Sequence, residues 1–530
     1  MGFRFLLLNL IFLVAFGAIG FNLYGLQVEN SDYYHKRVQA RSDYQKELKL
    51  RRGEIFFTDR NNNEIPTALN KDYPIVYAVP KEIDDIQETA DKLSKIIDKP
   101  EKEIINDINN SESLFSLLIN KASSEQIQLI NKLKPDGVYI GSKQYRYYPF
   151  NKLASHVLGF VGVNENYPEP TGLYGIENEY NKKLKSGDEI NLTIDRNIQV
   201  EAEDVLEKLV KKYEAVGGSV IIQKPKTGAV LAMANMPEFN PNEYSKSSIE
   251  NFINPSVQYV YEPGSVFKPL TMAIGIDTGV ITPDSTYHDK GTITLNGETI
   301  HNWDHKSYGK ITMTRVIERS INTGAVYAQD QIGDQRFINY LYKFGFESKT
   351  NIDLPNEVKG SLANITKSDA RQIDFATASF GQGTAVTPIQ LINAYSAIAN
   401  GGLLMRPYLN KDKGPYIKKR VIEEKTARQV ANMMESAVRK AKIGSIPEFN
   451  ISGKTGTAQV PDFEHGGYSD EYIHTFVGFA PTTAPQFVIL IKLDKPNVDL
   501  AGRTVVPAFK EMSQFMLNYY HIPPDNLPEE

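Results

Sequence analysis

Residues 5–28 form an uncharged run that constrains this chain more than any other feature of its sequence. The run reads FLLLNLIFLVAFGAIGFNLYGLQV and contains no Asp, Glu, Lys or Arg among its 24 residues. At a rise of about 1.5 Å per residue, a helix of this length reaches about 36 Å, enough to cross a hydrocarbon core of about 30 Å with some tilt. The sequence therefore predicts a short stub and a transmembrane anchor within residues 1–28.

The charges on either side of this run predict its orientation. Arg4 precedes it, whereas Glu29 and Asp32 follow it, and positively charged flanks stay in the cytoplasm. We therefore expect a single-pass protein of the cytoplasmic membrane, with the rest of the chain outside the cytoplasm. A cleaved signal peptide is the alternative, but its apolar core would span only about 7–15 residues, so the uncleaved anchor is favoured.

The rest of the chain has the composition of folded domains. Hydrophobic residues make up 41% and charged residues 23% of the 530 residues, close to average globular usage. The formal net charge of −5 shows no basic surplus of the kind that nucleic-acid-binding proteins carry. The absence of cysteine excludes disulfides and thiolate nucleophiles. We expect folded domains over residues 29–190 and 191–521, and a flexible tail over residues 522–530.

Local patterns predict several elements. Residues 74–80 (PIVYAVP) are apolar and β-branched, typical of a strand, whereas residues 86–135 have helical periodicity. Residues 191–195 (NLTID) predict a strand, and Asn197 is expected to cap the amphipathic helix that follows. Residues 225–228 (PKTG) are expected to form the turn of a β-hairpin.

Ser265 and Lys268, in the segment EPGSVFKPLTMAIGI, are the strongest candidates for catalysis. Gly264 permits a sharp turn and Pro269 is tolerated only in the first turn of a helix, so Ser265 should lie near the N-terminus of an apolar helix. Residues three apart on a helix share a face. A lysine in partly dry surroundings loses its proton more readily, and it can then activate the serine hydroxyl.

Two of the motif patterns occur twice in the chain, so neither is specific alone. Ser307 and Lys310 repeat the Ser-x-x-Lys spacing, but they lie in the polar stretch HNWDHKSYGKIT without an apolar helix behind them, which predicts a loop. The Lys-Thr-Gly tripeptide at Lys226–Gly228 falls in the predicted hairpin turn. Neither of these second copies is expected to be catalytic.

The other Lys-Thr-Gly copy, Lys454–Thr457 in NISGKTGTAQV, is flanked like a strand. Thr455 and Thr457 would then point to the same side. Gly456 between them would let a substrate or another backbone approach closely. A nucleotide-binding P-loop is excluded, because it needs glycine at the position that Glu448 occupies.

Ser320 and Asn322, in VIERSINTGAVYAQ, form the third element. Taken alone, the tripeptide predicts no more than a helix cap or a turn. The order Ser265-x-x-Lys268, Ser320-x-Asn322 and Lys454-Thr455-Gly456 is far more specific, because together these elements are the signature of β-lactamases and penicillin-binding proteins.

The chain resembles a class B penicillin-binding protein, a monofunctional peptidoglycan D,D-transpeptidase of bacteria, over nearly its full length. The resemblance implies an α+β fold with a strand-rich, non-catalytic pedestal (dimerisation-type) domain, followed by a penicillin-binding transpeptidase domain built as an antiparallel sheet with helices on both faces. Asn62-Asn63 and Ile65-Pro66 depart from the family's usual residues, but only within a turn. Segments similar to family motifs are Arg52–Ile55, Asp59–Asn61, Arg146–Pro149, Gly159–Gly162, Gly172–Glu177, Leu192–Asp195, Gly381–Gly383 and Phe476–Phe479.

The resemblance implies catalytic roles for five residues. Ser265 attacks the carbonyl of the penultimate D-alanine of a stem peptide, and Lys268 accepts the proton of Ser265. Ser320 relays a proton to the leaving amine, while Asn322 holds the substrate amide and Lys268. Lys454 supplies positive charge.

It also implies a substrate-binding strand. The hydroxyls of Thr455 and Thr457 bind the terminal carboxylate, with Gly456 between them. Backbone N–H groups of Ser265 and Thr457 form the oxyanion hole. An amine from a neighbouring stem peptide then resolves the ester and makes the cross-link.

The implied partners are stem peptides, β-lactams bound covalently at Ser265, and a membrane glycan polymerase, with no nucleic acid and with septal wall synthesis as the favoured setting. No cofactor is expected, and no metal either, because His301 and His305 have Asn302 rather than Glu between them and no third ligand. A β-lactamase or D,D-carboxypeptidase and a non-catalytic penicillin-binding sensor are the alternatives. The anchor with its pedestal speaks against the first two, and the very short cytoplasmic stub speaks against the sensor.

Overall fold

The computed structural model describes residues 2–24, 51–109, 113, 115–164, 167–462 and 465–526. The chain divides into two compact units. We call them the N-terminal unit (Met1–Arg52, Asn70–Tyr147 and Lys185–Gly187) and the C-terminal unit (Gly53–Leu69, Tyr148–Leu184 and Asp188–Glu530). In this division, residues 53–69 and 148–184 group with the part of the chain that contains all the candidate catalytic residues.

The C-terminal unit is built around a five-stranded antiparallel sheet in the order β16-β17-β18-β8-β9. Strand β18 is apolar and buried along almost its whole length, as expected of a central strand that is covered on both faces. Strand β16 lies at the edge of the sheet. The strands are β8 (Gly217–Gln223), β9 (Val230–Met236), β16 (Ser452–Pro461), β17 (Tyr468–Ala480) and β18 (Phe487–Asp494).

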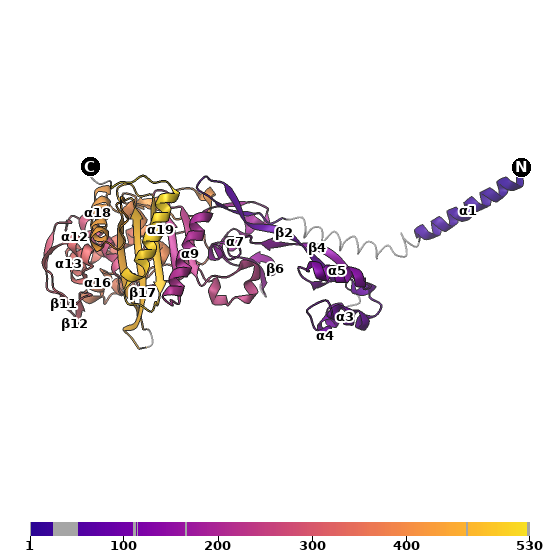
Figure 1. Ribbon diagram of the computed structural model, residues 1–530, viewed down its shortest axis with the longest axis horizontal. Helices are drawn as coiled ribbons and strands as arrows, with labels where there is room; N and C mark the ends of the chain where they lie inside the picture. The colour runs from indigo at the N-terminus through magenta and orange to yellow at the C-terminus, as the bar shows by residue number, and fades with distance from the viewer. Residues whose placement is uncertain are drawn as a thin grey trace. The chain divides into compact units, whose positions relative to one another are not determined.

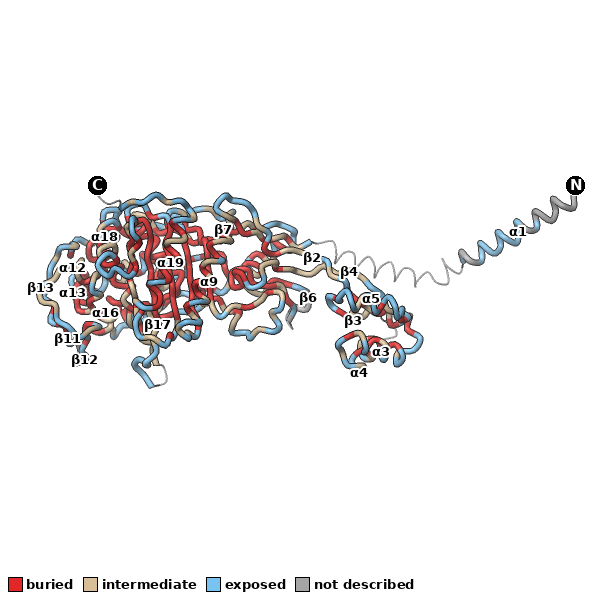
Figure 2. Tube along the Cα trace, in the orientation of Figure 1, coloured by how far each residue is buried: buried red, intermediate tan, exposed pale blue. Residues whose placement is uncertain are grey.

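Helices cover both faces of this sheet (Figure 1). Val220 and Ile222 of β8 pack into a core with α9 (Arg196–Lys212) and α19 (Val505–Tyr519), while Ile221 between them belongs to a second core on the opposite face. The buried chain in Figure 2 follows the sheet and these helices. The second core includes residues of α11 (Lys268–Asp277), α12 (Met313–Arg319), α13 (Asn322–Ile332), α14 (Asp334–Phe344), α16 (Gln372–Ala378), α17 (Pro388–Ala399) and α18 (Glu424–Ala441).

Smaller elements complete the C-terminal unit. Its helices are α6 (Ser155–Leu158), α7 (Gly175–Glu179), α8 (Asn181–Lys185), α10 (Pro255–Gln258) and α15 (Ala363–Thr366). Its two-stranded pairs are β5 (Val161–Asn164) with β6 (Tyr167–Gly172), β10 (Thr286–Asp289) with β13 (Gly309–Thr312), β11 (Thr292–Leu295) with β12 (Glu298–His301), and β14 (Leu403–Met405) with β15 (Ile417–Arg420). The predicted hairpin turn at residues 225–228 is confirmed, because β8 and β9 pair on either side of it.

Strand β7 (Ile190–Asp195) confirms the predicted strand at residues 191–195, and it pairs in parallel with β1 (Ile55–Thr58). The amphipathic helix predicted after it is confirmed as α9, but the predicted cap residue was wrong. The N-cap of α9 is Asp195, whose carboxylate accepts hydrogen bonds from the N–H groups of Asn197 and Ile198, so Asn197 lies within the first turn. A carboxylate suits this position because it satisfies two orphan donors and faces the positive end of the helix dipole.

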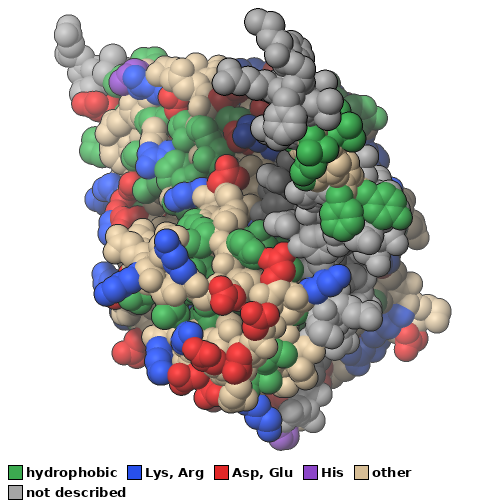
Figure 3. All heavy atoms as spheres, turned by 90° about the vertical axis from the view of Figure 1, so that its right-hand side faces the viewer, with side chains coloured by type: hydrophobic (Ala, Val, Ile, Leu, Met, Phe, Trp, Pro, Cys, Tyr) green, Lys and Arg blue, Asp and Glu red, His purple; other side chains and the backbone are tan. Residues whose placement is uncertain are grey.

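The N-terminal unit combines strands with three short helices around its own core, which includes Val76, Leu93 and Ile104. Strand β2 (Glu64–Ala78) begins well before the predicted strand at residues 74–80 and ends at Ala78, short of its predicted end. The predicted helical stretch at residues 86–135 contains α3 (Ile86–Ser94), α4 (Glu101–Ile108) and α5 (Ser124–Leu133), but β3 (Ser116–Ile119) interrupts it. The remaining strand is β4 (Val138–Tyr147). On the face drawn in Figure 3, acidic and basic side chains are intermixed.

Helix α1 (Gly2–Tyr24) covers most of the predicted anchor, and residues 25–28 lie outside the described residues. Among the helices that the structure describes, none is both long enough and apolar enough to span a membrane.

The predicted flexible tail at residues 522–530 is partly wrong. Asp525 accepts a hydrogen bond from the Asn450 N–H at 2.8 Å and its own N–H donates to the Glu448 carbonyl at 3.1 Å, while Ile522 packs against the core. The start of this segment is therefore bound to the C-terminal unit. Residues 527–530 lie outside the described residues.

Candidate active site

Ser265 lies in a single 3-10 turn, Gly264–Phe267, that leads directly into α11. Gly264 has a positive φ of 62°, which a side chain would strain, and Pro269 occupies the first turn of α11. These positions confirm the predicted sharp turn and helix start. The residues behind Ser265 are buried and apolar, so the serine is held on a rigid element at the rim of a cavity.

Lys268 is fully buried, and its ammonium group makes three hydrogen bonds. Its Nζ atom donates to the Ser320 carbonyl at 2.6 Å, to the Ser320 hydroxyl at 3.2 Å and to Asn322 Oδ1 at 2.8 Å. Burial holds the pKa of Lys268 well below its usual value, and the nearby charge of Lys454 lowers this pKa further. A lysine in this setting gives up its proton easily and can then accept one from a neighbouring hydroxyl.

Ser320 and Asn322 reach the site from a break between two helices. Ser320 caps α12 with a left-handed φ of 57°, and Asn322 is the first residue of α13. The Asn322 amide donates to the His301 carbonyl at 2.8 Å, which leaves its Oδ1 atom directed at Lys268. A left-handed serine is uncommon and costs about 1–3 kcal/mol, a cost typical of positions held for function.

Lys454 approaches Ser320 from the opposite side, on strand β16. Its Nζ atom lies 2.9 Å from the Ser320 hydroxyl and 2.9 Å from the Thr455 carbonyl. Burial lowers the pKa of Lys454 to about 7. The Ser320 hydroxyl is therefore placed between two lysine side chains whose pKa values are both lowered by burial.

Strand β16 also presents the predicted substrate-binding residues. Thr455 and Thr457 are partly exposed, whereas the residues between and beside them are buried, so the two threonines share the open side of the strand. A Cβ atom on Gly456 would lie 2.8 Å from the Pro263 carbonyl oxygen. The prediction that Gly456 admits another backbone is confirmed, and the backbone that approaches it is the turn that carries Ser265.

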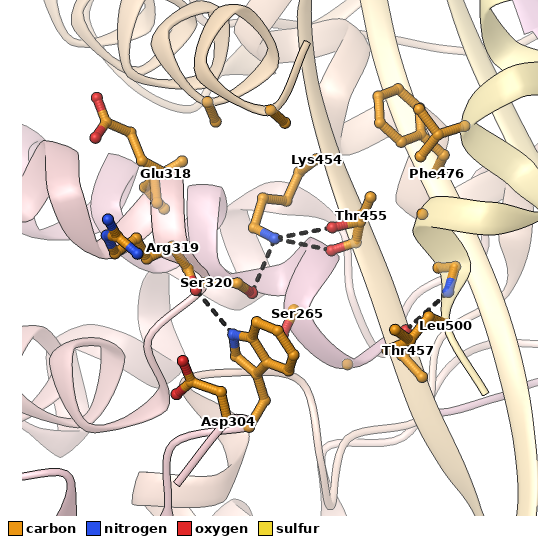
Figure 4. A pocket seen from close by; sticks show the side chains of 18 of the residues that line it. Ser265, Asp304, Glu318, Arg319, Ser320, Lys454, Thr455, Thr457, Phe476 and Leu500 are labelled. Atoms are coloured by element: carbon orange, nitrogen blue, oxygen red, sulfur yellow. Dashed lines mark hydrogen bonds between the residues drawn. The ribbon is translucent and has the colours of Figure 1, made fainter. Parts of the chain in front are cut away.

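These elements surround a cavity of about 930 Å³. Figure 4 shows Ser320, Lys454 and Thr455 linked by hydrogen bonds, with Ser265 beside them and Asp304 and Thr457 at either side. The cavity is polar along the catalytic residues, and apolar where α18 and α19 contribute Val438 and Val506. All eight candidate residues lie in the C-terminal unit, and six of them line this cavity. Gly456 lies between Thr455 and Thr457 on β16, and Lys268 is hydrogen-bonded to Ser320 at the cavity wall.

Sequence reasoning missed how the turn around Ser265 is supported. The Gly264 N–H donates to the Gly381 carbonyl at 3.1 Å, and a Cβ atom on Gly381 would lie 2.4 Å from the Gly264 carbonyl oxygen. The Tyr395 hydroxyl donates to the Val266 carbonyl at 2.6 Å. The sequence singled out Gly381–Gly383 only as similar to a family motif, and the folded chain shows that this segment supports the turn that carries Ser265.

The second motif copies lie elsewhere. The Ser307 hydroxyl donates to the Asp289 carbonyl at 2.8 Å within a loop, as predicted, whereas Lys310 lies on β13, where a loop was expected. The His301 and His305 rings pack 5.2 Å apart. In the part of the chain that the structure describes, no group of three His, Cys, Asp or Glu side chains could hold a metal ion.

Two protein families match overlapping ranges of the chain. Residues 218–514 match the family described as Penicillin binding protein transpeptidase domain, and residues 48–221 match Penicillin-binding Protein dimerisation domain. The first range contains all the candidate catalytic residues. The resemblance inferred from the sequence motifs is therefore confirmed.

Several curated proteins are similar to nearly the whole chain. Stage V sporulation protein D of Bacillus subtilis is 30% identical, over 86% of this chain and 76% of its own length. Probable peptidoglycan D,D-transpeptidase PbpC of Pseudomonas aeruginosa is 28% identical over 99% and 97%, and Peptidoglycan D,D-transpeptidase FtsI of Escherichia coli is 28% identical over 95% and 89%. The chain thus belongs to the class B penicillin-binding proteins, peptidoglycan transpeptidases that carry a dimerisation domain beside the transpeptidase domain.

Proposed function

We propose that Ser265 is the nucleophile of a D,D-transpeptidase reaction on peptidoglycan stem peptides. The observation that carries the proposal is a hydrogen-bonded network formed by the side chains of Lys268, Ser320 and Lys454. This network lies beside the cavity that Ser265 lines. Neutral Lys268 takes the Ser265 proton as the serine oxygen bonds to the carbonyl carbon of the penultimate D-alanine. The three hydrogen bonds of Lys268 go to Ser320 and Asn322, so one of them must break before Nζ can accept the Ser265 proton.

Breakage of the amide C–N bond releases the terminal D-alanine and leaves an ester on Ser265. Ser320 relays the proton from Lys268 to the leaving nitrogen, which suits a hydroxyl in contact with both lysines. An amine of a second stem peptide then attacks the ester carbonyl and loses its proton through the same hydrogen-bonded side chains. Breakage of the ester bond regenerates the Ser265 hydroxyl. Bonds formed and broken balance without a cofactor.

The substrate lies along strand β16 in this proposal. An edge strand has unpaired backbone groups that can bond an extended peptide, and β16 is at the edge of its sheet next to the serine turn. The Thr455 and Thr457 hydroxyls and the Lys454 charge receive the terminal carboxylate. The N–H groups of Ser265 and Thr457 receive the developing oxyanion, where each donor contributes about 3–4 kcal/mol in comparable enzymes.

The same steps predict covalent trapping of β-lactams, because their carbonyl acylates Ser265 and the leaving nitrogen stays tethered. A β-lactamase would hydrolyse this ester quickly, a D,D-carboxypeptidase would transfer the stem peptide to water rather than to an amine, and a sensor would hold the label without making cross-links.

The proposal is tested by labelling the detergent-purified chain with a fluorescent penicillin. Wild type and Ser307→Ala should keep the label through denaturing electrophoresis, whereas Ser265→Ala should not. Ser307 is the matched control, since it has the same Ser-x-x-Lys spacing in a loop. Labelling of Ser265→Ala would place the nucleophile elsewhere, and a label lost within minutes would favour a β-lactamase.

We also propose that residues 1–28 anchor the chain in the cytoplasmic membrane, with the catalytic unit outside the cytoplasm, beside a membrane glycan polymerase and in septal wall synthesis. The uncharged run and its flanking charges support the anchor. The division into a pedestal at residues 29–190 and a transpeptidase domain at residues 191–521 also stays a prediction. A chain lacking residues 1–28 should leave the membrane fraction and still bind penicillin; if it stays with the membrane, the anchor lies elsewhere.

A further inference from the structure

His474 is a buried histidine that the proposed reaction does not use. It lies on β17, directly opposite Thr457 in the register of β16 and β17, and its side chain is fully buried. Burial lowers the pKa of His474 to about 4, against the opposing influence of Asp499. The imidazole is therefore neutral at physiological pH, and it takes part in bonding as a neutral ring.

The His474 ring bonds to the segment that forms one wall of the cavity. Its Nδ1 atom lies 2.8 Å from the Thr504 hydroxyl oxygen, and Thr504 is itself buried. The Thr504 N–H donates to the Ala501 carbonyl at 3.2 Å, and the Thr504 hydroxyl lies 3.4 Å from the same carbonyl. His474 thus fixes one end of the short turn Ala501–Arg503 from inside the sheet.

The other end of this turn reaches the substrate-binding strand. The Ala501 N–H donates to the Thr457 hydroxyl oxygen at 3.3 Å, and Ala501 and Thr457 both line the cavity. Figure 4 shows Thr457 beside Leu500, across the cavity from Arg319 in this view. A buried ring on β17 is therefore connected to a hydroxyl on β16 through one backbone turn.

The direction of the Ala501 bond decides what the Thr457 hydroxyl can do. A hydroxyl has one hydrogen and two lone pairs. Because Ala501 donates to the oxygen, one lone pair is occupied, and the hydroxyl hydrogen is left to point into the cavity. A hydrogen directed this way suits a carboxylate, which only accepts hydrogen bonds.

We propose that His474 is a positioning residue for carboxylate recognition, acting through Thr504 and Ala501 to keep the Thr457 hydroxyl oriented as a donor. This inference rests on the proposed function, in which Thr457 receives the carboxylate of the substrate or of a β-lactam. Loss of the contact frees the turn, and the Thr457 hydroxyl can then rotate away from its ligand.

The test compares acylation by benzylpenicillin with acylation by its methyl ester, which lacks the carboxylate charge. Thr504→Val removes the hydroxyl and keeps the side-chain shape, whereas Thr504→Ser keeps the hydroxyl. His474→Leu removes the polar ring, whereas His474→Asn keeps a polar atom near the Nδ1 position. We expect Thr504→Val and His474→Leu to lower the acylation rate constant for benzylpenicillin about tenfold or more, and that for the ester less than twofold. Thr504→Ser and His474→Asn should stay near wild type.

Equal losses for the acid and the ester would overturn the proposal, because they would indicate general damage to the fold. Unchanged acylation by benzylpenicillin in Thr504→Val would overturn it as well. Melting temperatures identify any variant that fails to fold. If a variant at one of the two positions, His474 or Thr504, fails to fold, the pair of variants at the other position decides the outcome. Failure of the proposed function would give a different result, because the wild type itself would then not be acylated at Ser265.

Discussion

The Ser320 hydroxyl oxygen lies 2.9 Å from the Nζ atom of Lys454, although the two residues are 134 positions apart in the chain. The same oxygen lies 3.2 Å from Lys268 Nζ. Two buried lysines that share one hydroxyl oppose each other's charge, which is why the charge of Lys454 adds to burial in lowering the pKa of Lys268. This arrangement favours the neutral form of Lys268, which is the form that the proposed role as a base requires.

Two replacements of Ser320 distinguish the contribution of its hydroxyl to acylation from the effect of its left-handed backbone on stability. Ser320→Ala and Ser320→Gly both remove the hydroxyl, and we expect each to slow β-lactam acylation about 100-fold or more, the usual size of a proton-transfer contribution. Because φ at this position is 57°, the glycine variant should be more stable than the alanine variant by about 1 kcal/mol. Stopped-flow acylation and chemical denaturation measure the two effects. Full activity in Ser320→Gly would show that the hydroxyl carries no proton.

The pKa of Lys454, about 7, predicts the alkaline side of the pH profile. As the pH rises through this value the folded protein loses the Lys454 charge, so attraction for an anionic β-lactam weakens and acylation should decline. Lys454→Arg stays charged at all these pH values. We expect the arginine variant to acylate at pH 9 as fast as it does at pH 7. A decline of the same shape in both proteins would assign it to another group.

Asn322→Asp tests whether Lys268 is the base, because the new carboxylate should raise the pKa of the lysine. A carboxylate in place of Asn322 Oδ1, which lies 2.8 Å from Lys268 Nζ, favours the charged form of the lysine and raises its pKa. Acylation at pH 7 should fall about tenfold or more, and the rising limb of the pH profile should move to higher pH. Asn339→Asp, an exposed position on α14 whose amide bonds to Gln335, is the matched control and should leave the profile unchanged. If the rising limb of the pH profile of acylation did not move in Asn322→Asp, Lys268 would not be the base.

Gly456→Ala probes the close approach between β16 and the serine turn. The added Cβ would lie 2.8 Å from the Pro263 carbonyl oxygen and 3.0 Å from Val266 Cγ1. The turn must move away, so we expect a loss of about 1–3 kcal/mol of stability and a fall of about 100-fold in acylation, since displacements near 1 Å have that effect. Thermal melts and penicillin labelling check both. Unchanged labelling would mean that the two backbones adjust without disturbing Ser265.

Features that depend only on a residue and its neighbours along the chain could be predicted from the sequence. The positions of Gly264 and Pro269 predicted the start of α11 correctly, because each acts through its own backbone. Two of the predictions that the structure contradicts have a clear physical reason. Asp195 rather than Asn197 caps α9, since the choice between neighbouring polar residues depends on where strand β7 ends. Asp525 is bound to Asn450, although composition predicted a free tail, because one partner 75 residues away outweighs local preference.

The sequence by itself determined which residue types make up the site: two serines, two lysines, an asparagine, two threonines and a glycine, at spacings that place each on a turn, at a helix start or on a strand. Only the tertiary structure decided that Lys268, Ser320 and Lys454 meet, and that Gly381 and His474 support the turn and the wall around them. Those contacts join segments far apart in the chain. They form because burying both faces of one sheet brings its edge strand against the serine turn, and no local pattern records which distant residue will then be the neighbour.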